Sequence, residues 1–212
     1  MSNCYLCGGV ASTTDHIPPR GFFKALPVNK ITLPACESCN QSASLDEEYM
    51  RATLAAQGYG ARYVARDVWE GAVKRSFEHR PKGLRARLAQ ALVAVEIRTF
   101  AREIAGHLPG IKVDGARAGR VLRKIAKGIY YHEKGVRLDD NELLLFRDGD
   151  VRLDFEAITR GWPQVDMGEG FRYRSQHSAE GSMIWFEFYR TNWWLALTGD
   201  FARNYGKKKT GT

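Results

Sequence analysis

The chain has 212 residues, 44% of them hydrophobic and 26% charged, which is typical of a folded globular protein and excludes an intrinsically disordered one. It contains no apolar run of membrane-spanning length and no signal peptide before the first cysteine, so we expect a cytoplasmic protein without a membrane partner. The formal charge is +8, and residues 61–135 carry 17 Lys and Arg against 7 Asp and Glu. Such a basic region attracts nucleic acid, although a solvated arginine-rich helical surface has the same composition.

All four cysteines lie within the first 39 residues, in two pairs with two residues between the partners: Cys4 with Cys7, and Cys36 with Cys39. This spacing lets both sulfurs of a pair bind one ion from a tight turn, and four thiolates complete a tetrahedral site for structural Zn²⁺. Disulfides and a redox Cys-x-x-Cys motif are the alternatives. The expected reducing cytoplasm favours zinc over disulfides.

The segment between and after the cysteine pairs predicts a small folded unit. Residues 30–33 alternate like a short strand, and residues 40–56 have helical periodicity with acidic residues in the first turns. The order of knuckle, loop, strand, knuckle and helix is that of a zinc-stapled ββα unit. We assign this unit to residues 1–60.

The motif Asp15-His16-Ile17-Pro18-Pro19 lies between the two cysteine pairs, and Asn40 directly follows the last cysteine. This arrangement resembles the zinc-stapled HNH endonucleases of the ββα-metal type, over about residues 4–50. The resemblance implies an enzyme that hydrolyses phosphodiester bonds in nucleic acid, with DNA as the expected substrate. Family members often have a histidine where Asn40 stands, and Asn29 is the candidate for the family's central asparagine.

The resemblance also implies a role for each of three residues. His16 would be the general base, while Asp15 and Asn40 would bind one catalytic Mg²⁺ or Mn²⁺ through hard oxygen ligands. A histidine with a pKa near ~6.5 can take a proton from water at neutral pH, and an adjacent cation can neutralise the phosphate and the departing oxygen. In an extended strand Asp15 and His16 point to opposite faces. The structural alternative is that His16 only packs against the zinc knuckle.

Three helical segments are predicted in the basic middle of the chain, at residues 62–77, 84–104 and 116–131, with Asp114 as the N-cap of the third. Four cations lie at near-helical spacing in the third segment, opposite its apolar row. We expect this stripe to follow phosphates without reading bases. Its members are Arg117, Arg120, Lys124 and Lys127.

Short strands separated by glycines are predicted in the C-terminal part. They span residues 143–146, 151–158, 171–177, 182–189 and 193–197, with a hairpin turn at residues 190–192. The aromatic cluster around Trp185 and Trp194 would either stack bases or, as is more common, pack a sheet against helices. Residues 61–212 are therefore expected to form a second, α+β domain with a basic helical region and an antiparallel sheet.

Two functions remain open from the sequence. The first is a metal-dependent endonuclease whose C-terminal domain positions DNA. The second is a non-catalytic zinc-binding module that recognises nucleic acid or a protein. A homodimer or a protein partner is compatible with either function.

Overall fold

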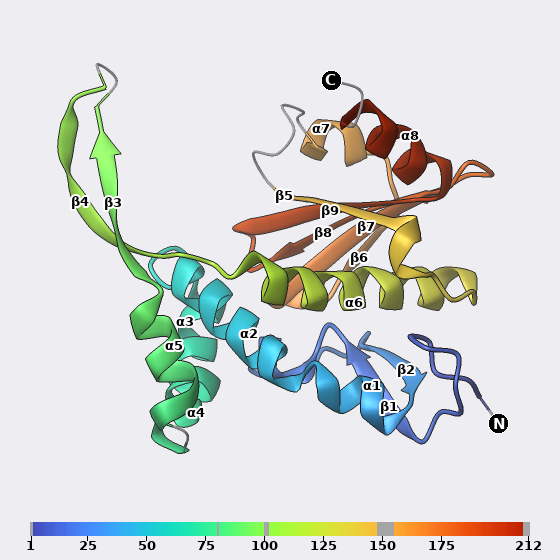
Figure 1. The fold of residues 1–212 in the computed structure, drawn as a ribbon, viewed down its shortest axis with the longest axis horizontal. Helices are drawn as coiled ribbons and strands as arrows, with labels where there is room; N and C mark the ends of the chain where they lie inside the picture. The colour runs from blue at the N-terminus through green and yellow to red at the C-terminus, as the bar shows by residue number, and fades with distance from the viewer. Residues whose placement is uncertain (1, 80, 100–101, 148–154, 210–212) are drawn as a thin grey trace.

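The computed structural model describes residues 2–79, 81–99, 102–147 and 155–209, and it is a mixed helix and sheet structure of the expected α+β class. The long helix α6 (Gly115–Lys134) lies across the middle of the molecule (Figure 1). A five-stranded sheet lies on one side of α6, and the N-terminal strands and helices lie on the other. In the described residues, no helix is both long and apolar enough to cross a membrane.

The N-terminal unit has the strand, strand, helix order that its sequence predicts. Strands β1 (Thr13–Ile17) and β2 (Ile31–Ala35) pair antiparallel, with the short helix η1 (Arg20–Phe22) between them. Helices α1 (Glu37–Ser42) and α2 (Ser44–Gly58) follow. The inward side chains of both strands are buried because alternate residues of a strand point to one face.

A helical arm and a hairpin follow this unit. The arm consists of α3 (Tyr63–Val68), the π-helix η2 (Trp69–Val73), α4 (Lys74–His79), the π-helix η3 (Pro81–Arg85) and α5 (Ala86–Gln90). The hairpin consists of β3 (Leu92–Arg98) and β4 (Ile104–Ile111), which project away from the rest of the molecule (Figure 1). The helix predicted over residues 84–104 is therefore wrong beyond residue 90. Alternating β-branched residues such as Val93 and Val95 favour a strand, whereas the leucine spacing had indicated a helix.

Helix α6 confirms the prediction of a helix at residues 116–131 and of Asp114 as its N-cap. The Asp114 carboxylate accepts hydrogen bonds from the backbone N–H groups of Ala116 and Arg117, at 3.0 and 3.2 Å. The helix ends at Gly135, whose φ of 68° closes it in the left-handed conformation. Gly128 lies where α6 comes closest to β1, because a Cβ at this position would be 2.5 Å from Ile17 Cγ1.

The C-terminal sheet is antiparallel throughout, in the order β5-β9-β8-β7-β6. Its strands are β5 (Leu143–Arg147), β6 (Gln164–Asp166), β7 (Phe171–His177), β8 (Ser182–Phe188) and β9 (Asn192–Thr198). The short helices η4 (Asp140–Glu142) and η5 (Gly168–Gly170) precede β5 and β7. Helices α7 (Phe155–Thr159) and α8 (Gly199–Lys209) lie on the side of the sheet away from α6 (Figure 1). Four predicted strands and the hairpin turn are confirmed. Of the strand predicted at 151–158, residues 151–154 lie outside the described residues and the remainder belongs to α7.

One apolar core runs from the N-terminal unit through α6 to the sheet. It contains Ile17 of β1, Ile125 of α6 and Phe186 of β8, all at most 1% exposed. A second cluster around Trp185 fills the space under α8. Trp185, Phe186 and Phe188 are thus core residues and present no face for base stacking. The segments 1–60 and 61–212 share this core.

Candidate functional site

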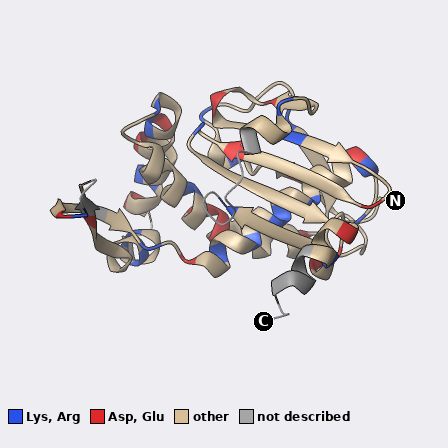
Figure 2. Ribbon diagram, turned by 90° about the horizontal axis from the view of Figure 1, so that it is seen from above, with Lys and Arg blue, Asp and Glu red and all other residues tan. Residues whose placement is uncertain are grey.

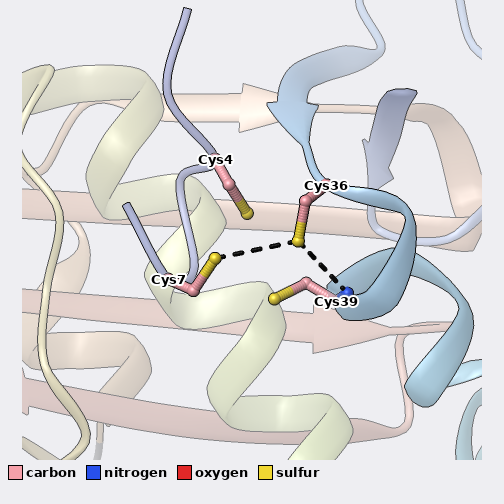
Figure 3. Close-up of side chains that lie close together, drawn as sticks. All are labelled: Cys4, Cys7, Cys36 and Cys39. Atoms are coloured by element: carbon pink, nitrogen blue, oxygen red, sulfur yellow. Dashed lines mark hydrogen bonds between the residues drawn. The ribbon is translucent and has the colours of Figure 1, made fainter. Parts of the chain in front are cut away.

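The four cysteines converge at one end of the N-terminal unit (Figure 3). Cys4 and Cys7 lie in a tight turn closed by a hydrogen bond from Gly8 N–H to Cys4 O. Cys36 follows β2 as the N-cap of α1, and Cys39 lies in the first turn of that helix. All four Sγ atoms lie within 4.8 Å of one another, and those of Cys7 and Cys36 are 3.7 Å apart.

This geometry fits a tetrahedral metal site. Four sulfurs at about 2.3 Å from one zinc ion lie about 3.8 Å from each other, close to the separation of Cys7 and Cys36. A disulfide needs about 2.05 Å between sulfurs, and all four cysteines are free. The cluster can therefore bind a metal such as zinc. Within the described residues it is the only group of three or more His, Cys, Asp and Glu side chains close enough to share an ion.

The polar surroundings of the cysteines favour a thiolate. Burial by itself would raise the pKa of the Cys4 thiol, but hydrogen bonds from backbone N–H groups, including that of Cys7, lower the pKa to about 7. Burial and the neighbouring sulfurs raise the pKa of Cys39. Cys4 thus loses its proton more readily than Cys39, and metal binding must displace the proton of Cys39.

Asp15 points from β1 into the protein. Its Oδ2 accepts a hydrogen bond from Tyr5 Oη at 2.8 Å and forms an ion pair with Lys124 Nζ at 2.8 Å. Its Oδ1 accepts the backbone N–H of His16 at 2.9 Å. Burial and the charge of Asp15 raise the pKa of Tyr5, so the hydroxyl stays protonated and donates. An ionised carboxylate has about four lone-pair sites, so one site on Oδ1 remains for a further ligand.

His16 occupies the opposite face of β1, where it is half-buried and pairs in register with Thr32 of β2. Burial lowers the pKa of His16 below its ordinary value, and the positive charges of Arg20 and Lys30 lower it further. The imidazole is therefore neutral at pH 7 and able to accept a proton. The exposed cations Arg20 and Lys30 give this face a positive potential.

Asn40 lies in α1, and its amide reaches the strand that carries Asp15 and His16. Its Nδ2 donates to Thr13 Oγ1 at 3.3 Å and to Thr14 O at 3.4 Å. Its Oδ1 accepts no hydrogen bond from the described residues. Asn29, the candidate for a central asparagine, instead donates from its exposed amide to Asp166 O at 2.6 Å, so its side chain is directed towards β6.

The four cations predicted as a nucleic-acid stripe do not form one exposed row. The side chains of Lys124 and Lys127 are only 4% and 7% exposed and are bound to carboxylates, so the expectation that they follow phosphates at the surface is wrong. Arg117 is also largely covered and lies beside Asp46 and Asp114. Arg120 is 59% exposed. Figure 2 shows acidic residues beside the basic ones over much of the molecule.

The structure instead places Lys124 in a buried ion-pair network. Lys124 Nζ bridges Asp15 Oδ2 at 2.8 Å and Glu47 Oε1 at 2.6 Å. Burial alone would lower the pKa of Lys124, but the charges of Glu47 and Asp15 raise it above its ordinary value. The sequence does carry a signal, since position 124 lies one turn from both Val121 and Gly128, on the buried side of α6.

Comparison of the chain with protein-family models, curated proteins and solved structures finds no match.

Proposed function

We propose that the chain is a metal-dependent endonuclease of the HNH type that hydrolyses phosphodiester bonds in nucleic acid, with DNA as the expected substrate. One observation carries the proposal: a cysteine cluster joins a β-hairpin to a helix, and the first strand of that hairpin bears Asp15 and His16 on opposite faces. The helix supplies Asn40, whose amide is bonded to the same strand. On this proposal, residues 1–60 form a zinc-stapled ββα module.

His16 would act as the general base. Its neutral imidazole takes a proton from a water molecule, the water oxygen bonds to phosphorus, and the bond from phosphorus to the 3′-oxygen breaks. Arg20 and Lys30, whose charges act on His16, would hold the phosphate on this face. The leaving 3′-oxygen takes up a proton from solvent.

On this proposal, two oxygens of the chain would bind a hard divalent ion. They are Oδ1 of Asp15, with one unused lone-pair site, and Oδ1 of Asn40. Mg²⁺ and Mn²⁺ accept one or two such protein ligands and complete their coordination with water and phosphate oxygens. When bound, the ion supplies neutralisation of the charge that develops on the phosphate. Tyr5 and Lys124 would fix the rotation of the Asp15 carboxylate.

Cleavage of supercoiled plasmid tests the proposal. The assay compares reactions with and without added Mg²⁺ or Mn²⁺, and it avoids EDTA because a chelator would also remove zinc from the cysteines. His16→Ala should lower the cleavage rate by about 10² or more and leave the zinc content unchanged, since the side chain is not a thiolate ligand. His107→Ala, which removes an exposed histidine from β4, is the matched control.

The metal assignment has a separate readout. Asn40→Ala should raise the Mg²⁺ concentration needed for half-maximal cleavage, and excess Mg²⁺ should restore part of the rate. His16→Ala should show no such recovery. Wild-type cleavage by His16→Ala, in protein free of contaminating nuclease, would show that His16 is not the base.

A non-catalytic zinc-binding module is the second candidate. The bonds of Asp15 to Tyr5, Lys124 and the backbone of His16 favour it, because they occupy three of about four lone-pair sites without any ion. Absence of cleavage with every divalent ion tested, in zinc-loaded protein that binds nucleic acid, would establish this candidate instead.

A further inference from the structure

A second polar site lies beside the Asp15–His16 strand. It is a cleft of about 590 Å³ between α2, α4 and the segment that leaves β1 through Pro19 and Gly21. Its polar lining consists mainly of Arg51, Arg75, Ser76, His79, Glu47 and Glu48. Glu47 also connects the cleft to Asp15, because it shares Lys124 with that carboxylate.

Arg51 lines this cleft, and among the residues that the structure describes its side chain donates a hydrogen bond only to Ser76. Its Nη2 donates to Ser76 Oγ at 3.1 Å, and its buried Nε has no hydrogen-bond partner. Gly21 allows the guanidinium to approach the chain closely, because a Cβ there would lie 2.4 Å from Arg51 Nη1. Burial lowers the pKa of Arg51, which reflects a cation removed from water without a paired carboxylate.

Arg75 and His79 complete the basic side of the cleft. They are four residues apart in α4 and therefore lie on the same face of the helix. Both side chains are exposed, and in the described part of the chain Arg51 and Arg75 form no ion pair. The cations of α6 differ, since Lys124 and Lys127 are each bound to a carboxylate. The cleft thus offers planar, multiply donating groups suited to phosphate oxygens.

We propose that this cleft binds a phosphodiester group of the nucleic-acid backbone, a few nucleotides from the bond that is cut. The location rests on the proposed nuclease function, whereas the binding itself does not. Pro19 in the wall of the cleft follows His16 by three residues, so their Cα atoms are at most about 11 Å apart. Phosphates recur every 3.4 Å of helix axis along one DNA strand, so a short duplex can span both places.

The acids of the cleft restrict the ligand further. Glu48 acts electrostatically on Arg51, and Glu47 faces the same space. Two arginines beside two carboxylates suit a phosphodiester, which carries a single negative charge, better than a free phosphate dianion. The accessible position of Arg75 and His79 also allows a continuous strand to pass.

Binding measurements without added Mg²⁺ or Mn²⁺ test the cleft independently of cleavage. Fluorescence anisotropy of a labelled DNA duplex, repeated over a range of salt concentrations, gives the affinity and its salt slope. Arg75→Gln should weaken binding about 5- to 20-fold at low salt and reduce the slope by about 0.9, the value for one lost phosphate contact. Arg160→Gln removes the same charge from an exposed residue directly after α7 and is the matched control.

Arg51→Gln should give a similar loss, and Arg75→Lys should restore part of it through the charge alone. Zinc content and circular dichroism confirm that each variant is folded. Equal effects of Arg75→Gln and Arg160→Gln would overturn the inference, as would displacement of DNA by inorganic phosphate at equimolar concentration. If the Arg75 effect is present and the wild type cuts nothing, the nuclease proposal fails and the phosphodiester site stands.

Discussion

Replacement of Lys124 by methionine tests how much the buried ion pairs of Lys124 contribute to the stability of the protein. The lysine side chain is 4% exposed, and its partners Asp15 and Glu47 are 6% and 19% exposed. Methionine fills a similar volume in α6 and removes only the amine. Asp15 would keep its bonds from Tyr5 and from the backbone of His16, whereas Glu47 would lose its hydrogen bond to Nζ.

The loss should be large because two carboxylates would remain without their counter-charge. Removal of one partner from a buried ion pair costs about 3–5 kcal/mol, and partial access of Glu47 to water places the expected value near 3 kcal/mol. For a chain of this size, a loss of about 3–5 kcal/mol lowers the melting temperature by about 6–20 °C. Lys74→Met is the control, because its i,i+4 pair with Glu70 is exposed to solvent and its loss should change the stability little.

The loss of stability in Lys124→Met should depend on pH. Burial raises the pKa of Glu47, and the positive charge of Lys124 opposes this, so Lys124→Met should raise that pKa further. A carboxyl whose pKa in the folded protein exceeds its unfolded value of about 4.3 destabilises the folded state. This destabilisation grows as the pH rises from the unfolded pKa to the folded pKa.

The two variants are therefore compared by urea unfolding at pH 8 and pH 5.5, with zinc content measured at both. The difference in the free energy of unfolding between Lys124→Met and Lys74→Met should be smaller at pH 5.5 than at pH 8. A gap below about 0.5 kcal/mol at pH 8 would refute the reasoning, because the network would then contribute no more than a surface pair.

Four further substitutions test other parts of the structure. Cys36→Ser should reduce bound zinc to well under one ion per chain and lower the melting temperature, because structural zinc binding is coupled to folding; elemental analysis with full zinc retention would contradict this. Gly128→Ala should destabilise the protein by about 1–2 kcal/mol in urea unfolding, since overlap with Ile17 outweighs the better helix propensity. Gly119→Ala, with no atom near its Cβ in the same helix, should instead stabilise by about 0.5–1 kcal/mol, and equal effects at the two glycines would contradict the packing argument. Arg120→Gln should weaken DNA binding several-fold at low salt, and unchanged anisotropy would mark Arg120 as a solvated side chain.

Local signals in the sequence predicted much of the fold. The Asp114 cap and the apolar spacing of Val121, Ile125 and Ile129 define α6, and alternation defines the strands of the sheet. The helix predicted over residues 84–104 is wrong at β3 because the local signals there conflict. There, leucine spacing and alternation coexist in one segment, and only the pairing of β3 with β4 decides between them.

The candidate site was predictable only where ligand spacing is local. Two residues between the cysteines of each pair predicted a cluster, and the structure confirms that the four sulfurs converge. The partners of Asp15 were not predictable, because Tyr5 comes from the turn between Cys4 and Cys7 and Lys124 from α6, and only tertiary packing brings both to the carboxylate. A helical cation is usually solvent-exposed, so the charge of Lys124 predicted a surface position, although its spacing from Val121 and Gly128 places it on the buried side of α6.

Stability alone does not account for a lysine at position 124. A buried ion pair contributes little net stability compared with apolar residues of similar volume, and leucine there would extend the buried face of α6. A lysine differs from leucine because it pairs with Asp15 and, together with Tyr5, fixes the rotation and the charge environment of the carboxylate. Both effects matter if Oδ1 of Asp15 is to bind a cation. On the proposed function, α6 is therefore part of the site as well as of the core, since the helix that packs against the sheet also orients the residue expected to hold the metal.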